Sequence, residues 1–463
     1  MSTSHSVIVV GAGISGLACA HALKQSGADV LLLESSASPG GMIHSVEDAG
    51  FLFESGPQSF NATAALNVLI HDLGLADELV PAPAGAPRYI FVDGKLKPVP
   101  LSPPAFIGSS LLKWSTKFSV LREPFQKSFP PEEDESIADF VRRKFSPELL
   151  NLLVGPFVSG IYAGDPEKIS LRAAFPALYE AEKAAGSIIR GMKSVRKKGT
   201  EPQAKKMTLA SFRRGNQSLI KALAVRLGDS LRTDVRVTQI ARAASSGFEL
   251  LADTPSGAAQ FQAAQVVLAT PTYVAASLLK PLAPAAADAL SQIEYAPVAV
   301  VSLGYRRADV SHSLNGFGFL VPRSVGLKIL GTVWNASLFA NRAPNDHVQL
   351  TSFLGGATDP ETVSLSDSSL VDLAHRELTP ILGLKARPTI SRVTAYEKAI
   401  PQYNLGHTAR LGTVRSVLEN IPDVHLIGNY LRGPAIGACI EQAQEVAESI
   451  RTGSRPATFG VAP

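Results

Sequence analysis

The fold is decided by the stretch "SVIVVGAGISGLACAHALKQSGADVLLLE", which runs over residues 6–34. Its apolar run from Val7 to Val10 predicts a buried parallel strand, and a helix and a second apolar strand follow. Between the first strand and the helix stand Gly11, Gly13 and Gly16. At this spacing the first glycine permits a tight turn, the second lets the backbone approach a pyrophosphate, and the third lets the helix pack on the strand. The stretch therefore predicts a Rossmann-type βαβ unit that binds phosphates at its helix N-terminus.

Two further features indicate which dinucleotide is bound. Glu34 ends the second strand eighteen residues after Gly16, where its carboxylate can accept a hydrogen bond from a ribose 2′-hydroxyl and disfavours NADP. A second glycine-rich loop follows at Gly40-Gly41, and "GFLFESGPQSF" follows it over residues 50–60. Such loops suit a long, extended dinucleotide that needs further backbone contacts. This part of the chain therefore predicts FAD.

Composition excludes several classes of protein. The chain has 463 residues, 45% of them hydrophobic and 18% charged, which allows two or three domains and a large core. A formal net charge of +4 is too small to indicate nucleic-acid binding. The two cysteines lie in helix-like patterns and the nine histidines lack ligand spacing, so we expect neither a disulfide framework nor a metal site. Without a secretion signal or an apolar run of about 18 residues, we expect a cytoplasmic protein that does not span a membrane.

Two later stretches also have the pattern of a dinucleotide-binding domain. Within residues 235–271, short β-rich runs are separated by a Ser-Gly turn, and a buried strand over 266–268 stops at Ala269-Thr270-Pro271. Small residues at that carboxyl end leave room for a ligand. The stretch "HLIGNYLRGPAIGACIEQAQEVAESI" (425–450) reads as a short strand, a glycine-containing turn and a helix. From its residues alone this helix either binds a ligand or only caps the domain.

Nearly the whole chain resembles the FAD-dependent amine oxidase and desaturase superfamily, and within it the members that oxidise porphyrinogens. Beside residues 425–450, the strongest stretches are "GIYAGDPEKISLRAAFP" (160–176), "GFGFLVP" (316–322) and "IPQYNLGH" (400–407). The resemblance implies an α/β fold of mixed α and β structure. We expect a discontinuous Rossmann-type FAD-binding domain, an inserted helical domain that associates with membranes, and a β-sheet substrate domain. The expected segments are 1–86, 206–275 and 391–463 for the first, 87–205 for the second and 276–390 for the third.

The resemblance further implies the six-electron oxidation of protoporphyrinogen IX to protoporphyrin IX in haem biosynthesis, in three FAD cycles with O2 as the final acceptor. No catalytic side chain is expected, because the cofactor takes the hydride. Three alternatives stay open: oxidation of coproporphyrinogen III, the reaction of another amine oxidase or carotenoid desaturase, and a flavin-free binding protein of the escort type. The segment "GPAIG" (433–437) has no aromatic residue, which disfavours the cage of an amine oxidase. The intact glycine triplet and Glu34 disfavour a protein that has lost the flavin.

The resemblance also implies the residues that contact substrate and cofactor. Arg88 would pair with a substrate propionate, Phe317 and Leu320 would enclose the tetrapyrrole, and Gly160 would approach a bridging carbon. The helix over 436–450 would direct the positive end of its dipole at the flavin ring. The expected FAD contacts are Gly11, Gly13, Ile14, Ser15, Gly16, Glu34, Ser35, Gly40, Gly41, Met42, Gly56, Pro57, Gln58, Ser59, Val237 (through its backbone, to the adenine), Ala269, Tyr403, Gly428, Asn429, Gly433 and Ile436.

The sequence departs from the family pattern at a few positions. Ser38 and Met42 stand where Arg or Lys is common, so a phosphate contact there depends on backbone donors. Ala438 stands where many relatives have Asp, and a hydrogen bond from that position to the flavin is not expected. Arg214 stands where glycine is frequent.

Residues 102–129 predict contact with a membrane. Their apolar side chains alternate with Lys113, Lys117, Arg122 and Lys127, and a second basic run spans 190–206. Apolar anchors with flanking cations are typical of a segment lying on anionic lipid, although a solvated face over an ordinary core helix fits the residues alone at least as well. With the resemblance, we expect peripheral association with the inner face of the cell membrane. A homodimer and a contact with ferrochelatase are the other partners considered.

Overall fold

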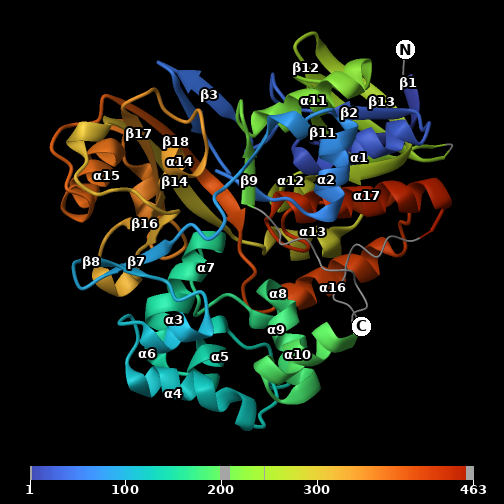
Figure 1. Cartoon of the computed structure of the whole chain (residues 1–463). Coiled ribbons are helices and arrows are strands. Elements are labelled where there is room, and N and C mark those ends of the chain that lie inside the picture. The colour runs from blue at the N-terminus through green and yellow to red at the C-terminus, as the bar shows by residue number, and fades with distance from the viewer. Residues whose placement is uncertain (1–2, 199–208, 245, 455–463) are drawn as a thin grey trace.

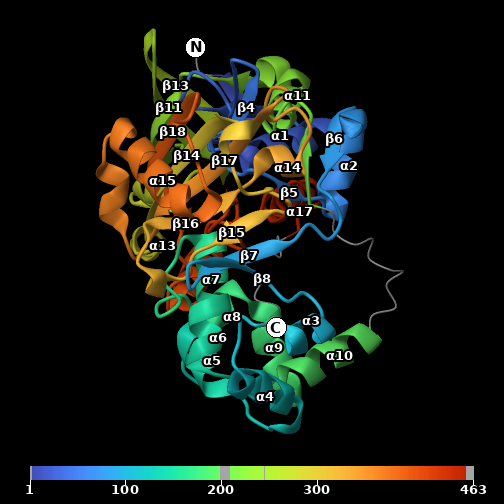
Figure 2. The same ribbon diagram turned by 60° about the vertical axis from the view of Figure 1, so that its left-hand side comes forward.

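A computed structural model describes residues 3–198, 209–244 and 246–454. Two large sheets and a lobe of short helices account for most of these residues. The helical lobe lies below both sheets in Figure 1 and in the turned view of Figure 2, so it projects from the rest of the molecule. This architecture confirms the mixed α/β class and the inserted helical part.

The first sheet contains the dinucleotide-binding unit. Its order is β10-β2-β1-β13-β12-β11, with β19 beside β13, and β10, β2, β1, β13 and β19 run parallel. Val10 pairs with both Leu33 and Leu268, so three parallel strands end at one edge and their loops meet there. The strand bounds are β1 (Thr3–Val10), β2 (Val30–Leu33), β10 (Leu231–Arg232), β11 (Arg236–Arg242), β12 (Phe248–Thr254), β13 (Gly257–Leu268) and β19 (Val424–Leu426).

Helices cover both faces of the first sheet, which is why its parallel strands read as continuous apolar runs. On one face pack α1 (Ile14–Gln25), α2 (Ala64–Asp72), α11 (Gln217–Leu227) and α17 (Ile436–Thr452). On the other face pack α12 (Thr272–Leu279), α13 (Pro284–Ser291) and α16 (His407–Leu418). The helices α1 and α17 pack on each other, so the two ends of the chain meet in one layer.

The second sheet has the order β18-β14-β17-β16-β15-β7-β8 and is antiparallel except between β15 and β7. One face packs on α15 (Asp367–Leu382). On the other, inner face, Val298, Val300 and Leu330 form an apolar cluster against which Met42 of the first part packs. The strands are β7 (Arg88–Val92), β8 (Lys95–Pro98), β14 (Tyr295–Arg306), β15 (Gly318–Leu320), β16 (Ile329–Val333), β17 (His347–Gly355) and β18 (Ile390–Pro401).

The helical lobe has a core that includes Ile137, Phe140, Leu150 and Val158. Residues 176–198 form two helices, and Gly186 between them adopts a left-handed φ of +64° that ends the first helix. None of the described helices has the length and apolarity needed to cross a bilayer. The elements are α3 (Pro103–Gly108), α4 (Trp114–Arg122), η2 (Glu123–Phe125), α5 (Ile137–Lys144), α6 (Pro147–Leu149), the π-helical turn η3 (Leu150–Val154), α7 (Gly155–Tyr162), α8 (Leu171–Ala174), α9 (Pro176–Ala185) and α10 (Ile188–Lys198).

One of the cations expected on the lobe surface is buried. The Lys117 side chain is only 4% exposed, and its amino group donates to the carbonyls of Ile107 and Ser109, both at 2.7 Å. The prediction that Lys117 faces lipid is therefore wrong, because the amino group ties α4 to the end of α3. Lys113, Arg122 and Lys127 are exposed. Of the second basic run, residues 199–206 lie outside the described residues.

Smaller elements join the three parts. Two small sheets contain β3 (Ser45–Asp48) with β4 (Phe51–Glu54), and β5 (Phe60–Asn61), β9 (Leu209–Phe212) and β6 (Leu79–Pro81). The remaining helical turns are η1 (Ala76–Glu78), η4 (Gly228–Ser230), η5 (Arg307–Asp309), η6 (Arg323–Val325), α14 (Asn335–Leu338) and η7 (Pro360–Ser364).

The chain passes between these parts at different points from those expected. Residues 88–98, predicted within the helical domain over 87–205, form β7 and β8 of the second sheet, because β7 pairs with β15. The same sheet includes residues 391–401, predicted in the FAD-binding domain. Conversely, α12 and α13 pack on the first sheet although the substrate domain was expected to start at 276. A strand pattern predicts a strand without indicating which sheet it joins.

Candidate functional site

The first βα turn is shaped by its glycines in two ways. A Cβ on Gly16 would lie 1.8 Å from the carbonyl oxygen of Gly11, and a Cβ on Gly11, at φ +100°, would lie 2.9 Å from that of Ala269. These two glycines therefore permit close packing. A Cβ on Gly13 would meet nothing within 4 Å, and no side chain caps the helix that begins at Ile14. The N–H groups of Ile14, Ser15 and Gly16 thus lie at a helix start beside open space, which fits a diphosphate.

The Glu34 carboxylate is held by backbone donors at the end of β2. The Ala12 N–H donates to Oε2 at 2.7 Å, and the Ser36 N–H donates to Oε1 at 2.8 Å. Because each carboxylate oxygen has two lone pairs, acceptor capacity remains for ribose hydroxyls. The Glu34 carbonyl accepts from Val235 at 2.8 Å, which brings the strand of Val237 next to it. Glu34 and Val237 therefore border the same end of the expected FAD site. Ser35 is exposed beside them.

The second glycine-rich loop lies directly against the first. The Gly40 N–H donates to the Ala12 carbonyl at 2.8 Å, and a Cβ on Gly41 would lie 3.4 Å from the Gly13 Cα. Met42 follows and packs on the inner face of the second sheet, which suits an apolar residue at a position where relatives often carry a cation. A Cβ on Gly56 would lie 2.1 Å from the Met42 carbonyl oxygen. The start of α1, Glu34 and the loop with Gly40 and Gly41 together form what we call the FAD cradle. The loop with Gly56, Pro57, Gln58 and Ser59 extends this cradle towards the second sheet.

The C-terminal strand and helix return to this cradle, as expected. β19 pairs with β13 beyond β1, and α17 packs on α1, with the Cys439 thiol of α17 near the Ser15 side chain at the start of α1. Ala269 directly follows β13, and its N–H donates to the Val10 carbonyl at 2.8 Å. The first and last helices thus begin side by side. Ile436, the first residue of α17, is buried among the core residues they share.

The two glycines of the turn before α17 have different surroundings. A Cβ on Gly428 would lie 2.8 Å from the Tyr430 ring, so this glycine makes room for a neighbour in its own turn. A Cβ on Gly433, at φ +127°, would meet nothing within 4 Å. The contact of Gly428 and Gly433 with FAD stays a prediction, and the open space beside Gly433 fits it. Asn429 and Gly433 lie at the two ends of this turn.

Tyr403 fixes that turn. Its hydroxyl donates to the Asn429 carbonyl at 2.7 Å and accepts from the Gly433 N–H at 2.6 Å. The Tyr403 ring stacks on the His407 ring at 4.3 Å, and Nε2 of His407 lies 2.9 Å from the Tyr430 carbonyl, to which it can donate. Burial lowers the pKa of His407 to about 4, so the ring is neutral at neutral pH. Tyr403, expected to contact FAD, therefore uses its hydroxyl to hold the backbone of the turn.

Four predicted substrate residues come together at the second sheet. Arg88 on β7 pairs with Gly318 on β15, and its guanidinium lies over the Phe317 ring at 5.1 Å. Leu320, two residues on, approaches α7, where a Cβ on Gly160 would lie 3.1 Å from the Leu320 Cδ2. Arg88 is exposed, and no ion pair of Arg88 is found among the residues that the structure describes. A guanidinium thus stands beside an apolar surface, an arrangement that suits an apolar ligand carrying carboxylates.

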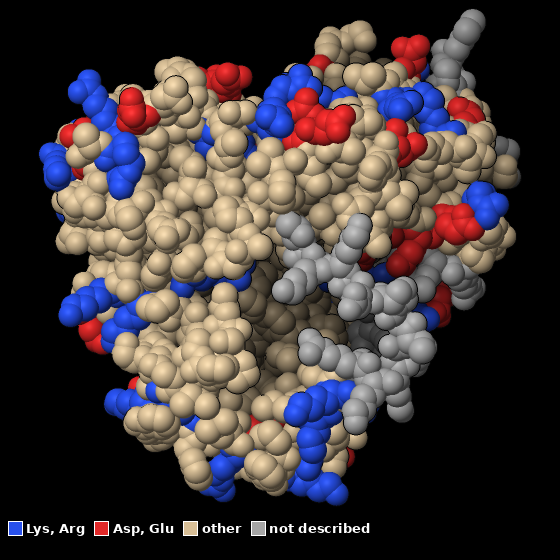
Figure 3. Space-filling view, in the orientation of Figure 1, with Lys and Arg blue, Asp and Glu red and all other residues tan. Residues whose placement is uncertain are grey.

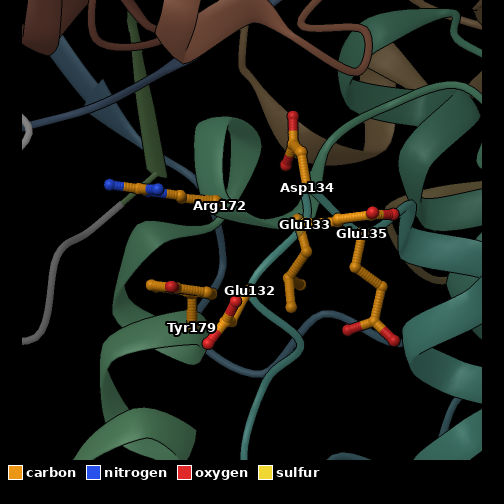
Figure 4. Close-up of a pocket in the computed structure, with 7 residues that line it drawn as sticks. Glu132, Glu133, Asp134, Glu135, Arg172 and Tyr179 are labelled. Carbon is orange, nitrogen blue, oxygen red and sulfur yellow. The ribbon is translucent and has the colours of Figure 1, made fainter.

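Figure 3 shows the molecule hollowed between the helical lobe and the parts above it, and the visible walls of the hollow carry few charged side chains. A cavity of about 300 Å³ lies where the three parts meet, lined by residues that include Glu294, Tyr295 and Gln402. Neither this cavity nor the pocket in Figure 4 is lined by Arg88 or Phe317. The apolar surface with Arg88 is therefore separate from both.

The pocket in Figure 4 joins the lobe to the Tyr403 segment. Figure 4 shows Arg172 above Tyr179 and pointing away from the acidic loop 132–135, and its guanidinium lies 5.4 Å from the centre of the Tyr179 ring. One Asp134 oxygen accepts from the Ser170 hydroxyl at 2.6 Å, and the other accepts from the Gly406 N–H at 2.8 Å. These bonds tie the acidic loop to Ser170 and to Gly406, so Asp134 has a structural role at this junction.

Sequence reasoning missed the residues that support the cradle: His407, Tyr430, Glu54, Arg342 and Asn335. His407 could have been found, because it ends the "IPQYNLGH" stretch, four residues after Tyr403. The others stand in patterns typical of ordinary core or loops. Arg214, noted as a departure from the family pattern, makes an exposed ion pair with Glu78 at 3.2 Å, and Gly215 beside it adopts φ +88°.

The chain is similar to known flavin enzymes over almost its whole length. The family model of flavin containing amine oxidoreductases matches residues 14–451. The chloroplastic protoporphyrinogen oxidase of Oryza sativa is 39% identical over 96% of this chain and 87% of its own length. The coproporphyrinogen III oxidase of Bacillus subtilis is 29% identical over 95% and 96%, respectively. A crystal structure from Exiguobacterium sp. 255-15, provisionally assigned as a protoporphyrinogen oxidase, has a TM-score of 0.81 at 27% identity and covers 98% of this chain and 100% of its own.

Proposed function

The chain belongs to the family of flavin-containing amine oxidoreductases, and on this premise we propose that it oxidises protoporphyrinogen IX to protoporphyrin IX with O2. It is an FAD-dependent oxidoreductase, and the cradle described above fits FAD: open space at Gly13 and Gly433, an uncapped helix start at Ile14 and a carboxylate at Glu34. When bound, FAD supplies a two-electron acceptor for the hydride of a bridging carbon and passes the electrons to O2. Three rounds remove six electrons and six protons, and reduce three O2 to three H2O2.

The observation that carries the proposal is the surface around Arg88. Protoporphyrinogen IX is large and apolar, with two propionates on one side. The partly exposed Phe317 and Leu320 offer an apolar wall, and the Arg88 guanidinium over Phe317 offers a bidentate partner for a carboxylate beside it. Since the pyrroles already favour hydride loss, the work of these residues is to orient the substrate and to exclude water from the reacting carbon.

The test is turnover of two porphyrinogens by the purified flavoprotein. Incubation with protoporphyrinogen IX under air should give fluorescent protoporphyrin and peroxide faster than autoxidation does. Coproporphyrinogen III is the second candidate substrate, favoured by the similarity to the Bacillus subtilis enzyme. The proposal requires a larger kcat/KM for protoporphyrinogen IX, because specificity is a ratio of these constants. A larger value for coproporphyrinogen III would replace the proposed substrate, and turnover of simple amines alone would exclude both.

We also propose that the lobe binds anionic membranes on their cytoplasmic side. The support is a group of exposed aromatic side chains on α4 and the segment after it: Trp114, Phe118, Phe125 and Phe129 are 57–87% exposed. Exposed aromatic residues beside cations suit an interfacial surface, and an apolar substrate dissolves in such a membrane. A homodimer and a contact with ferrochelatase remain predictions.

A further inference from the structure

A buried ion pair joins the FAD cradle to the second sheet. The Arg342 and Glu54 side chains are 1% and 2% exposed, and Nη1 of Arg342 lies 3.2 Å from Oε1 of Glu54. Glu54 ends β4, whereas Arg342 follows α14, 288 residues later in the chain. Burial raises the pKa of Glu54, which Arg342 and hydrogen-bond donors oppose. Because burying two charges is costly even when they are paired, such a pair is weak evidence of a contribution to stability alone.

The Glu54 carboxylate is the centre of a hydrogen-bond network. The Ser45 hydroxyl donates to Oε2 at 2.6 Å, and the Asn216 N–H donates to Oε1 at 2.9 Å. Arg342 also donates to the Ser211 hydroxyl. Three separate parts of the chain are therefore held in one arrangement: β3 with β4, the segment from β9 to α11, and the loop after α14.

The same network fixes the loop that follows Glu54. The Gln58 Nε2 donates to the Gly56 carbonyl at 2.9 Å, and the Asn216 Nδ2 donates to the Pro57 carbonyl at 2.7 Å. The Gln58 Oε1 then accepts from the Asn335 Nδ2 at 2.7 Å, from α14. Side chains on both sides of the junction thus determine the course of loop 55–59.

This loop lies between the phosphate end of the cradle and the inner face of the second sheet. Gly41 contacts Gly13, Met42 follows Gly41 and packs on the inner-face cluster, and Gly56 packs against the Met42 carbonyl. A shift of loop 55–59 would therefore move Met42 and change the separation between the flavin and the substrate surface. Close-packed interiors transmit such displacements instead of absorbing them.

We propose that Arg342 and Asn335 are positioning residues that act through Glu54 and Gln58 to set the separation between the FAD cradle and the substrate surface. The inference rests on the proposed function, because hydride transfer requires the substrate carbon to lie close to the flavin. Arg342 and Asn335 are each 1% exposed, so both act from outside the substrate surface.

The first test separates positioning from stability. In Arg342→Met the Glu54 charge is left buried and unpaired, so the variant should lose thermal stability. The double variant Glu54→Gln/Arg342→Met has no charge to bury and should regain most of that stability. Its kcat/KM for protoporphyrinogen IX should nevertheless stay about ten-fold or more below wild type, and its flavin absorption band should be shifted. If stability, kcat/KM and flavin spectrum all return together, the pair is structural and the inference is overturned.

A second variant avoids the charges. Asn335→Leu removes only the bond to Gln58, and it should weaken FAD binding and lower kcat/KM in the same direction by about three- to ten-fold. The matched control is Arg387→Met, which breaks an ion pair with Asp372 on the surface and should change none of these quantities. An unchanged FAD dissociation constant and kcat/KM in Asn335→Leu would overturn the inference.

The flavin measurements distinguish this inference from the proposed function, since they use no porphyrinogen. If the wild type fails to oxidise protoporphyrinogen IX but the double variant still shifts the flavin band, the substrate is wrong and the positioning role stands. If the wild type turns over and the double variant matches it, the substrate stands and the positioning role falls.

Discussion

The FAD cradle and the helical lobe differ in what their critical residues do. In the cradle, Gly11 and Gly16 are required by the backbone of neighbouring elements, and Tyr403 and Glu34 use their polar atoms on N–H and carbonyl groups. In the lobe, Trp114, Phe118 and Phe125 leave large apolar side chains in solvent. The cradle is therefore a structure in which position matters, and the lobe presents a surface whose chemistry matters. Substitutions in the two regions should accordingly have different consequences.

The largest expected effect is that of Gly16→Ala in the cradle. The new Cβ would lie 1.8 Å from the Gly11 oxygen and 3.1 Å from the Ala269 Cβ. Since the first contact is with backbone, no side-chain rotation relieves it, and we expect a loss of about 3 kcal/mol or more in the free energy of unfolding. Flavin absorbance per mole of protein and urea unfolding measure the two consequences.

Gly412→Ala is the matched control for that variant. Gly412 lies in α16 and is exposed, and a Cβ added there would meet nothing within 4 Å. The change should stabilise the protein by about 0.5–1 kcal/mol through helix propensity, without loss of flavin. Equal behaviour of the two variants would mean that the cradle is not close-packed.

The second effect concerns the stability of the folded chain at acidic pH. Burial lowers the pKa of His407 to about 4 from its usual 6.5, while the Tyr430 carbonyl opposes the shift. Between these values the unfolded chain binds more protons on this ring than the folded chain does. The contribution of this ring to the free energy of unfolding is therefore fully present above pH 6.5. It decreases by about 3 kcal/mol as the pH falls towards 4. His425 on β19, with its pKa also lowered to about 4, adds to the same slope.

Urea unfolding at a series of pH values tests this account. His407→Gln should reduce the slope of the unfolding free energy between pH 6.5 and 4. The lobe contains no histidine between residues 99 and 198, so acid should loosen the cradle before it loosens the lobe. An identical slope in His407→Gln would show that the ring does not titrate as its burial implies.

The third effect lies where the substrate surface begins. Arg88→Ala should raise KM for the porphyrinogen with a smaller loss in kcat, because a propionate partner acts in ground and transition states alike. The expected loss is about 1–3 kcal/mol, as for a charge-assisted hydrogen bond left unmade. Steady-state kinetics measure it, with Lys95→Ala, an exposed cation on the neighbouring β8, as the control. A large fall in kcat at constant KM would assign Arg88 a different role.

The contrast also explains how much of the molecule the sequence could predict. The βαβ unit was predictable because Gly11, Gly13 and Gly16 fix a local turn, and an apolar run fixes a buried strand. The role of Tyr403 was not, because its partners Asn429 and Gly433 lie 26 and 30 residues away. Similarly, β7 reads as a strand, but its pairing with β15 joins residues that no local pattern connects.

Lys117 shows the same limit at the surface. A lysine between Trp114 and Phe118 has the spacing of a lipid-facing cation, yet its amino group is buried against two carbonyls and lies 4.5 Å from the Trp114 ring centre. Charge patterns predict which residues can reach a surface, whereas burial depends on how the helices of the lobe pack. The smallest predicted effect, on vesicle binding, depends on which lysines and arginines of the lobe are exposed and which are buried.

Binding to anionic vesicles should depend on Lys113, Arg122 and Lys127 by about 1 kcal/mol each, because these cations are exposed and near such a surface. Burial of the Trp114 and Phe118 rings in the lipid interface adds a part that salt does not screen. High salt should therefore release the wild-type protein only partly in co-sedimentation, and Trp114→Ser/Phe118→Ser much more completely. Lys117→Gln should instead lower the thermal stability of the lobe, because it removes a donor from two buried carbonyls. If Lys117→Gln reduced vesicle binding as Lys113→Gln does while stability stayed unchanged, the lobe surface would differ from the one described. If the wild-type protein stayed in the supernatant at low salt, it would receive its substrate through water.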